Sequence, residues 1–227
     1  MRGNDVLQEK LPSKKNNVYK KERVSGGKTH FVVEKEFSES GRFFTELKIS
    51  ELLKDSDINT PRLLGAEQST ENRPGRLIYE FIDGDVALNA LSEEVISLIA
   101  GWMKRFYEIA LENTNEQWIL GDIHLRNFIY DPKEQAVFGF DFEEARKGVI
   151  EEDVARLFLF ITTYEPEYCE KHMKLAEHFL KAALFEFDID KGSLIGFVQE
   201  EAERMAERRG KEVKTGRVLP IVEKAYS

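Results

Sequence analysis

The chain has 227 residues with 33 basic and 42 acidic side chains, so its formal charge at pH 7 is −9. That balance argues against a nucleic-acid-binding protein that depends on bulk positive charge. Hydrophobic residues make up 41% of the chain, which is enough for a folded core and excludes a wholly disordered protein. The length suits one large domain or two small lobes.

Cysteine content and apolar runs bear on location. Cys169 is the one cysteine of the sequence, which excludes a disulfide framework within the chain and a cysteine-rich zinc site. Residues 1–15 are polar and contain no apolar segment of the kind found in secretory signals. No apolar run approaches the roughly 18 residues that span a bilayer. We therefore expect a cytoplasmic protein without a membrane span.

The first third of the chain is predicted to form β-strands. Hydrophobic and polar residues alternate along several short runs, and Gly26-Gly27 between two of them is typical of a hairpin turn. A helix is predicted where Phe43, Phe44 and Leu47 recur near helical spacing. The predicted strands lie at residues 6–11, 18–24, 30–37, 62–66 and 76–82.

After the break at residues 83–85 the chain is predicted to be mainly helical. Ser92 is a good N-cap, residues 119–129 are mixed and rich in loops, and residues 137–140 predict a short strand. The predicted helices lie at residues 92–112, 153–163, 167–187 and 193–209. We predict an α+β fold of two lobes, an antiparallel β-rich lobe with one helix at 1–83 and a larger, mainly helical lobe at 84–227.

One constellation carries chemistry. Asp122 is followed five positions later by Asn127, and Asp141 comes fourteen positions after that, behind the short predicted strand. Phosphoryl transfer needs a carboxylate that orients the attacking hydroxyl and accepts its proton, together with hard oxygen ligands for Mg²⁺. Asp122 suits the first task, and Asn127 and Asp141 suit the second.

The segment around Asp122 resembles the catalytic loop of the protein-kinase-like phosphotransferases. It looks most like the aminoglycoside phosphotransferase and choline kinase branch, whose loop commonly reads His-Gly-Asp-x-His-x-x-Asn. Gly121, Asp122, His124 and Asn127 match that pattern, whereas Leu120 stands where the branch usually has a histidine. The resemblance implies the bilobal kinase fold, ATP and Mg²⁺ as cofactors, and a scaffold role for His124.

The same resemblance implies further site residues. Lys35 on the third strand would pair with the ATP α/β phosphates, and Glu46 in the following helix would hold it. Asp153 corresponds to the structural aspartate that follows the metal-binding one. In addition, Ser13 and Asn17 fall in a loop that would cover the phosphates, and the hinge that contacts adenine would be formed by Glu80, Phe81 and Ile82.

Three details favour a small-molecule kinase over a protein kinase. His124 stands where serine/threonine kinases usually have lysine, and Glu143 replaces the glycine of the protein-kinase Asp-Phe-Gly motif. The stretch from residue 142 to residue 152 is too short for a full activation segment. The predicted partner is therefore a small-molecule hydroxyl acceptor, with no nucleic acid involved.

The acceptor itself is left open by the sequence. The acids near Asp141 would attract a cationic alcohol such as an aminoglycoside or choline, or else form a solvated helix start; these acids are Glu143, Glu144, Glu151 and Glu152. A sugar or Kdo-type kinase and a small atypical protein kinase are alternatives. A competing class is a kinase-like pseudoenzyme that serves as a nucleotide-binding scaffold. The mixed-charge stretch 200–214 is typical of a solvated helix with i,i+4 ion pairs, and the alternative is a helix that docks a protein partner.

Overall fold

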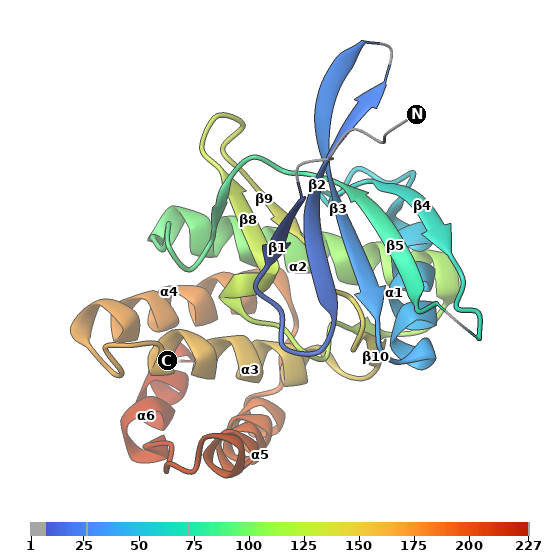
Figure 1. Ribbon diagram of the computed structural model, residues 1–227. Helices are drawn as coiled ribbons and strands as arrows, with labels where there is room; N and C mark the ends of the chain where they lie inside the picture. Colours follow the sequence, from blue (N-terminus) through green and yellow to red (C-terminus); the bar gives the residue numbers. More distant parts are fainter. Residues whose placement is uncertain (1–7, 26, 72, 227) are drawn as a thin grey trace.

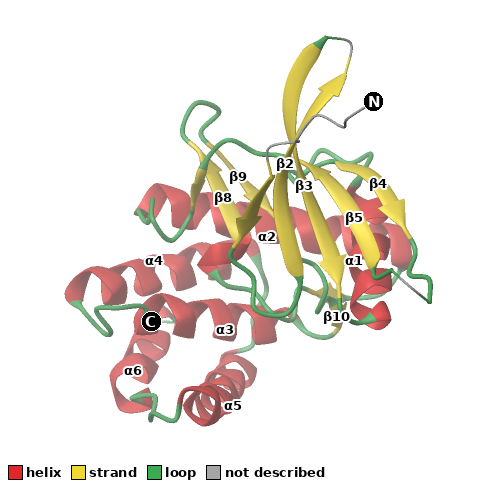
Figure 2. Ribbon diagram, viewed as in Figure 1, coloured by secondary structure: helices red, strands yellow, loops and turns green. Residues whose placement is uncertain are grey.

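The computed structural model describes residues 8–25, 27–71 and 73–226. Its N-terminal strands gather in a twisted sheet on one side of the molecule, and most helices lie on the other side (Figures 1 and 2). The predicted α+β class, with a small antiparallel β lobe that carries one helix and a larger, mainly helical lobe, is confirmed. The predicted division at 83/84 stays a prediction; β5 ends at Glu80 and β6 begins at Asp85.

The sheet of the small lobe has five strands in the order β1-β2-β3-β5-β4, and all neighbours are antiparallel. The strands β2 and β3 form the predicted hairpin, in which Ser25 pairs with Lys28. The strand predicted at 76–82 ends earlier in the structure, because β5 stops at Glu80 and Phe81 and Ile82 lie beyond it. The bounds are β1 (Gln8–Leu11), β2 (Asn17–Ser25), β3 (Lys28–Phe37), β4 (Leu63–Glu67) and β5 (Gly75–Glu80).

Helix α1 (Ser40–Leu53) connects the two cores of the molecule. Near its beginning, Phe43 packs into a small cluster under the sheet with Phe37 and residues of β5. Near its end, Ile49 and Leu53 belong to the large core of the helical lobe. Because one helix contributes to both cores, the side chains that α1 presents are fixed relative to both lobes.

The large lobe is built from five helices within the described residues. Ser92 caps α2 as predicted, since its Oγ accepts the N–H of Val95 at 3.2 Å. Asp190 caps α5 in the same way through Ser193, and residues 215–225 form a further helix for which the sequence made no prediction. The bounds are α2 (Glu93–Thr114), α3 (Ile150–Thr163), α4 (Glu170–Glu186), α5 (Lys191–Arg209) and α6 (Thr215–Ala225).

Short strands position the loops between α2 and α3. A three-stranded sheet is formed by β6 (Asp85–Val86), β8 (Phe128–Asp131) and β9 (Ala136–Gly139), and β7 (Trp118–Ile119) pairs with β10 (Arg146–Lys147). The prediction of a loop-rich stretch up to residue 129 was wrong at its end, because Phe128 already begins β8. Within the described residues, none of the helices combines the length and apolar character needed to cross a membrane.

Candidate active site

The loop that carries Asp122 is held by a buried carboxylate. Asp153 on α3 is 1% exposed and accepts the N–H of Leu120 at 2.6 Å, the N–H of Gly121 at 3.0 Å and the hydroxyl of Tyr107 at 2.9 Å. Burial raises the pKa of Asp153 to about 6, against the effect of these hydrogen bonds. Asp153 thus lies where the resemblance implied a structural aspartate, at the base of the loop.

Gly121 is required by this loop for two reasons. Its φ of +74° lies in the left-handed region that favours glycine, and a Cβ at this position would collide with the carbonyl oxygen of Glu144. Asp122 directly follows this tight turn, and a larger side chain at position 121 would change the shape of the turn.

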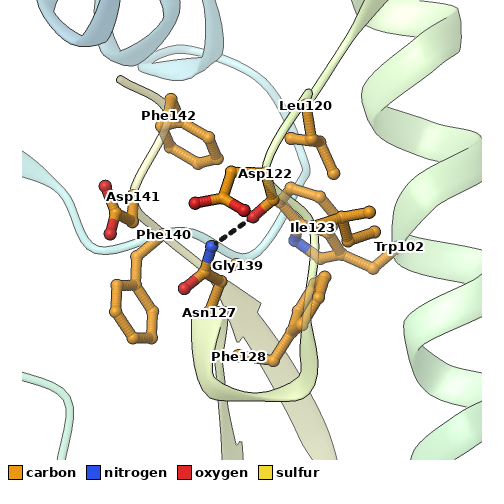
Figure 3. A pocket seen from close by; sticks show the side chains of 10 residues that line it. All are labelled: Trp102, Leu120, Asp122, Ile123, Asn127, Phe128, Gly139, Phe140, Asp141 and Phe142. Carbon is orange, nitrogen blue, oxygen red and sulfur yellow. Dashed lines mark hydrogen bonds between the residues drawn. The ribbon is translucent and has the colours of Figure 1, made fainter. Parts of the chain in front are cut away.

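Asp122, Asn127 and Asp141 line the same pocket (Figure 3). The Asn127 amide donates its N–H to the Asp122 carbonyl at 2.8 Å, which leaves Oδ1 as the atom available to a ligand. Figure 3 shows these polar side chains on one side of the pocket and the apolar Trp102 and Ile123 on the other. One amide oxygen and one carboxylate are hard oxygen donors of the kind that Mg²⁺ prefers, so this donor set fits the metal.

Asp141 has an unusual backbone conformation, and the residues on either side of it are packed against the core. Its φ of +68° is unusual for a residue other than glycine, although aspartate tolerates it better than most. On one side, Gly139 lies against the ring of Trp102, where a Cβ would collide. On the other, Phe142 is buried and stacks on Trp102 and Phe106. These contacts aim the Asp141 carboxylate away from the core, and its side chain is 39% exposed.

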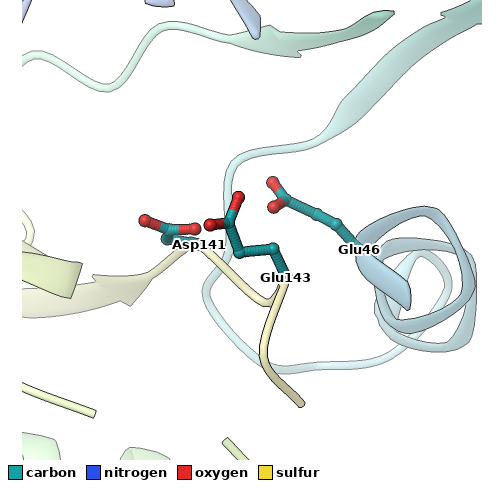
Figure 4. A group of neighbouring side chains, drawn as sticks. All are labelled: Glu46, Asp141 and Glu143. Atoms are coloured by element: carbon teal, nitrogen blue, oxygen red, sulfur yellow. The ribbon is translucent and has the colours of Figure 1, made fainter. Parts of the chain in front are cut away.

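Lys35 is surrounded by three carboxylates. Its Nζ lies 2.5 Å from Glu46, 2.6 Å from Asp141 and 2.9 Å from Glu143. The three acids, which face one another in Figure 4, lie within 4.8 Å of one another and have the spacing of a metal site. Since the ammonium group of Lys35 contacts all three, we interpret this cluster as a cage for the lysine rather than as a metal site.

Charge and burial are balanced in this carboxylate cage. The Lys35 side chain is 8% exposed; burial opposes its charge, but the surrounding carboxylates raise its pKa well above the ordinary value. Burial raises the pKa of Glu46 to about 7, with Lys35 opposing the shift. Glu46 also accepts the hydroxyl of Tyr79 at 3.1 Å. The Lys35–Glu46 pair is therefore formed between two side chains that are almost completely buried.

Glu143 and Asn16 are site residues that the sequence analysis did not assign to this role. Glu143 accepts the Asn16 amide and Arg42 Nη1, the latter at 2.9 Å, in addition to its contact with Lys35. Burial opposes the shift, but these partners hold the pKa of Glu143 below its usual range. The acid after Phe142 thus links the loop before β2, helix α1 and strand β3. The sequence signal for this role was that Glu143 replaces the glycine of the Asp-Phe-Gly motif.

The structure does not bring Ser13 and Asn17 to the pocket. Both are exposed; Ser13 Oγ accepts the N–H of Asn16 at 3.3 Å, and Asn17 Oδ1 accepts Lys10 Nζ at 3.1 Å. Asn16 between them is the buried member of the loop. The sequence analysis assigned Ser13 and Asn17 of this loop, but it did not assign Asn16, whose side chain is the buried one.

The predicted hinge residues lie at the end of β5, where Glu80 is the last residue of the strand and Phe81 and Ile82 follow it. Glu80 is exposed and lies 3.7 Å from Arg62, while its N–H donates to the Arg62 carbonyl at 2.9 Å. The Phe81 ring packs beneath Lys20 Nζ, 3.9 Å from its centroid. Ile82 is half-buried at the start of the connection to the large lobe. Their contact with adenine stays a prediction.

A second network reaches Asp122 from the helical lobe. Arg156 on α3 donates to the Gly121 carbonyl and, at 3.0 Å, to Asp122 Oδ1. Its other nitrogen donates to Glu201 on α5 at 3.0 Å, and Glu201 is 3% exposed. Arg156 was not predicted, although it follows Asp153 by three positions and therefore shares a helix face with it.

His124 occupies a protected position beside this loop. Burial lowers its pKa, its Nδ1 is buried without a hydrogen-bond partner in the described part of the chain, and its ring meets Phe160 edge-on at 5.4 Å between centroids. Three of the four acids that would attract a cationic acceptor have other partners: Glu143 and Glu144 pair with Arg42, and Glu152 pairs with Arg146.

Comparisons with known proteins leave the chain without a family assignment. No family model matches it, and no curated protein matches it. Among many matching solved structures is the kinase PK-1 of Cydia pomonella granulovirus, with 22% sequence identity and a TM-score of 0.48. The match covers 62% of this chain and 52% of the viral one, about half its length. A likeness at this score carries no inference about activity or acceptor.

Proposed function

We propose that the chain is an ATP- and Mg²⁺-dependent phosphotransferase that moves the γ-phosphate of ATP to a hydroxyl of a small molecule. One observation carries this proposal. Lys35, the loop that carries Asp122 and Asn127, and Asp141 are three separate segments of the sequence, and each of these residues lies at the pocket or contacts a residue that lines it. Membership of the aminoglycoside phosphotransferase and choline kinase branch stays a prediction.

On the nucleotide side, Lys35 would contact the α/β phosphates, with Glu46 holding its ammonium group in place. Asn127 Oδ1 and the Asp141 carboxylate would hold Mg²⁺, which neutralises charge on the phosphates when bound. Glu80, Phe81 and Ile82 would contact adenine. The loop next to Asn16 is tied to Glu143, and this tie supports its role as a cover for the phosphates.

On the acceptor side, Asp122 would orient the attacking hydroxyl. The acceptor oxygen forms a bond to the γ-phosphorus, the bond from that phosphorus to the β–γ bridging oxygen breaks, and the hydroxyl proton passes to the Asp122 carboxylate. Arg156 keeps the carboxylate in place through its contact at 3.0 Å. Most of the rate enhancement would come from this positioning and from charge stabilisation.

A small acceptor is supported by the short path from Asp141 to α3. Phe142 is buried, β10 (Arg146–Lys147) pairs with β7, and α3 begins at Ile150. This path leaves little chain for a surface that could bind an extended peptide, so we favour a small molecule over a protein as acceptor.

The test separates binding from turnover. ATP affinity with and without Mg²⁺ is measured by calorimetry, and ADP release is followed with aminoglycosides, choline, sugars and a generic protein substrate. We expect Asp122→Ala to retain ATP affinity and lose turnover, and Asp141→Ala to lose Mg²⁺-dependent affinity. Full activity in Asp122→Ala would refute the assignment. ATP binding by the wild-type chain with no turnover on any acceptor would favour the pseudoenzyme class.

A further inference from the structure

Two arginines lie on aromatic rings next to the loop that carries Asp122. Arg126 lies over the ring of Tyr164, 5.8 Å from its centroid, and Arg209 lies over the ring of Phe160 at 5.6 Å. The two rings are 6.0 Å apart. We call Arg126, Phe160, Tyr164 and Arg209 the arginine–aromatic cluster.

The cluster is attached to the loop by direct contacts. The Tyr164 hydroxyl accepts the N–H of Leu125 at 3.2 Å, and the Phe160 ring packs edge-on against His124, two positions after Asp122. Burial raises the pKa of Tyr164 to about 12; Arg126 and Arg209 oppose that shift and Asp122 adds to it. Arg126, Arg209 and Asp122 therefore all lie close enough to the Tyr164 hydroxyl to influence its pKa.

Arg209 is held in place by the end of a well-anchored helix. It is the last residue of α5, and Gly210 in the left-handed conformation caps the end of the helix. One position earlier, Arg208 pairs with the buried Glu201 at 2.6 Å, and Glu201 in turn binds Arg156 of α3. The same arginine that contacts Asp122 thus fixes the helix from which Arg209 projects.

Neither arginine of the cluster has an acidic partner within the described residues, although both are exposed. Their neighbours on α5 are paired, since Arg204 contacts Glu200 at 3.1 Å and Arg208 contacts Glu201. In a chain of net charge −9, two guanidinium groups without an acidic partner among the described residues lie next to the loop that carries Asp122. Rings behind them limit their motion, and planar guanidinium groups match phosphate and carboxylate oxygens.

We infer that the phosphoryl acceptor carries a compact anionic group, a phosphate or a carboxylate, that binds between Arg126 and Arg209 while its hydroxyl faces Asp122. This inference rests on the proposed function of the site. It replaces a cationic acceptor, because three of the four acids thought to attract a cation are already ion-paired. The repulsion between an anionic acceptor and Asp122 makes two arginines a reasonable requirement.

The first test does not depend on turnover. The side-chain Nε–Hε signals of Arg126 and Arg209 are followed by NMR while glycerol 3-phosphate or glycerate is added at physiological ionic strength, with glycerol as the neutral control. We expect saturable shifts of both signals with an anion and none with glycerol. Phosphate and carboxylate are distinguished by which probe binds more tightly. Absence of saturable shifts with both anions would overturn the inference.

The second test uses turnover with matched variants. We expect Arg126→Gln and Arg209→Gln to raise the KM for an anionic acceptor by about 10-fold or more, with kcat and the KM for ATP nearly unchanged. Arg105→Gln, which removes the same charge where Asp57 provides a partner, is the control and should change neither. If the wild type used choline or glycerol in preference to glycerol 3-phosphate and glycerate, the inference would be refuted and the proposed kinase activity would stand. Saturable NMR shifts without any turnover would support the anion site and count against the kinase.

Discussion

Replacing Lys35 by methionine should leave three carboxylates without their counter-charge. Methionine keeps most of the apolar stem, so the change reports mainly on the ammonium group. That group is 8% exposed and lies within 2.9 Å of Glu46, Asp141 and Glu143. Removing one partner of a buried ion pair typically costs about 3–5 kcal/mol, a large part of the roughly 5–15 kcal/mol by which a domain is stable.

The penalty should depend on pH and on divalent cations. Glu46 already has a pKa of about 7 beside Lys35, and loss of the lysine raises it further. The folded variant therefore binds a proton more readily than the unfolded one, so its stability falls as pH rises through 7 and recovers at lower pH. Ca²⁺ or Mg²⁺ should restore part of the loss, because the three acids lie within 4.8 Å of one another.

Urea denaturation of wild type and Lys35→Met at several pH values, with and without Ca²⁺, measures these effects. Lys133→Met is the matched control: Lys133 is 76% exposed and lies 3.6 Å from Asp83, so its loss should cost less than about 0.5 kcal/mol. A loss in Lys35→Met no larger than in the control, or one insensitive to both pH and cations, would refute the reasoning about the cage.

Three further variants test the remaining contacts. Asp153→Asn removes a carboxyl whose pKa rises from 3.8 to about 6 on folding; because ionisation of this carboxyl destabilises the folded state, the stability of wild type relative to the variant should fall by ~2 kcal/mol between pH 4 and pH 6, as measured by denaturation at both ends. Arg156→Met should lower kcat about 10-fold with little change in the KM for ATP, and Arg156→Lys should restore part of it; equal kcat in all three proteins would exclude a positioning role. Glu143→Gln should lower the free energy of unfolding by about 1–3 kcal/mol and speed amide exchange in the loop next to Asn16, whereas unchanged exchange there would show that the tie is unimportant.

The sequence was sufficient for much of the fold because local patterns coincide with tertiary demands. Alternation along residues 30–37 predicts a strand, and the structure has β3 there. Ser92 with two acids behind it predicts a helix start, and its Oγ caps α2. By contrast, β8 was missed, because four residues from Phe128 onward form a strand only through pairing with β9.

The site was predictable where residue order along the chain carries information. The motif around Asp122 predicts a catalytic loop, and the Lys35–Glu46 contact that the resemblance implied is present in the structure. Contacts such as Arg156 with Asp122 and Asn16 with Glu143 join residues 34 and 127 positions apart. Such contacts depend on how the lobes and loops pack, which no local pattern specifies.

The most direct test of the central claim is the ratio of turnover between wild type and Asp122→Asn, each saturated with Mg·ATP and an acceptor that the wild type uses. The account predicts that the variant binds ATP as tightly as wild type but releases ADP at least ~10²-fold more slowly, since a positioned general base typically contributes 10²–10⁴-fold. A variant with normal ATP affinity and wild-type ADP release would contradict it.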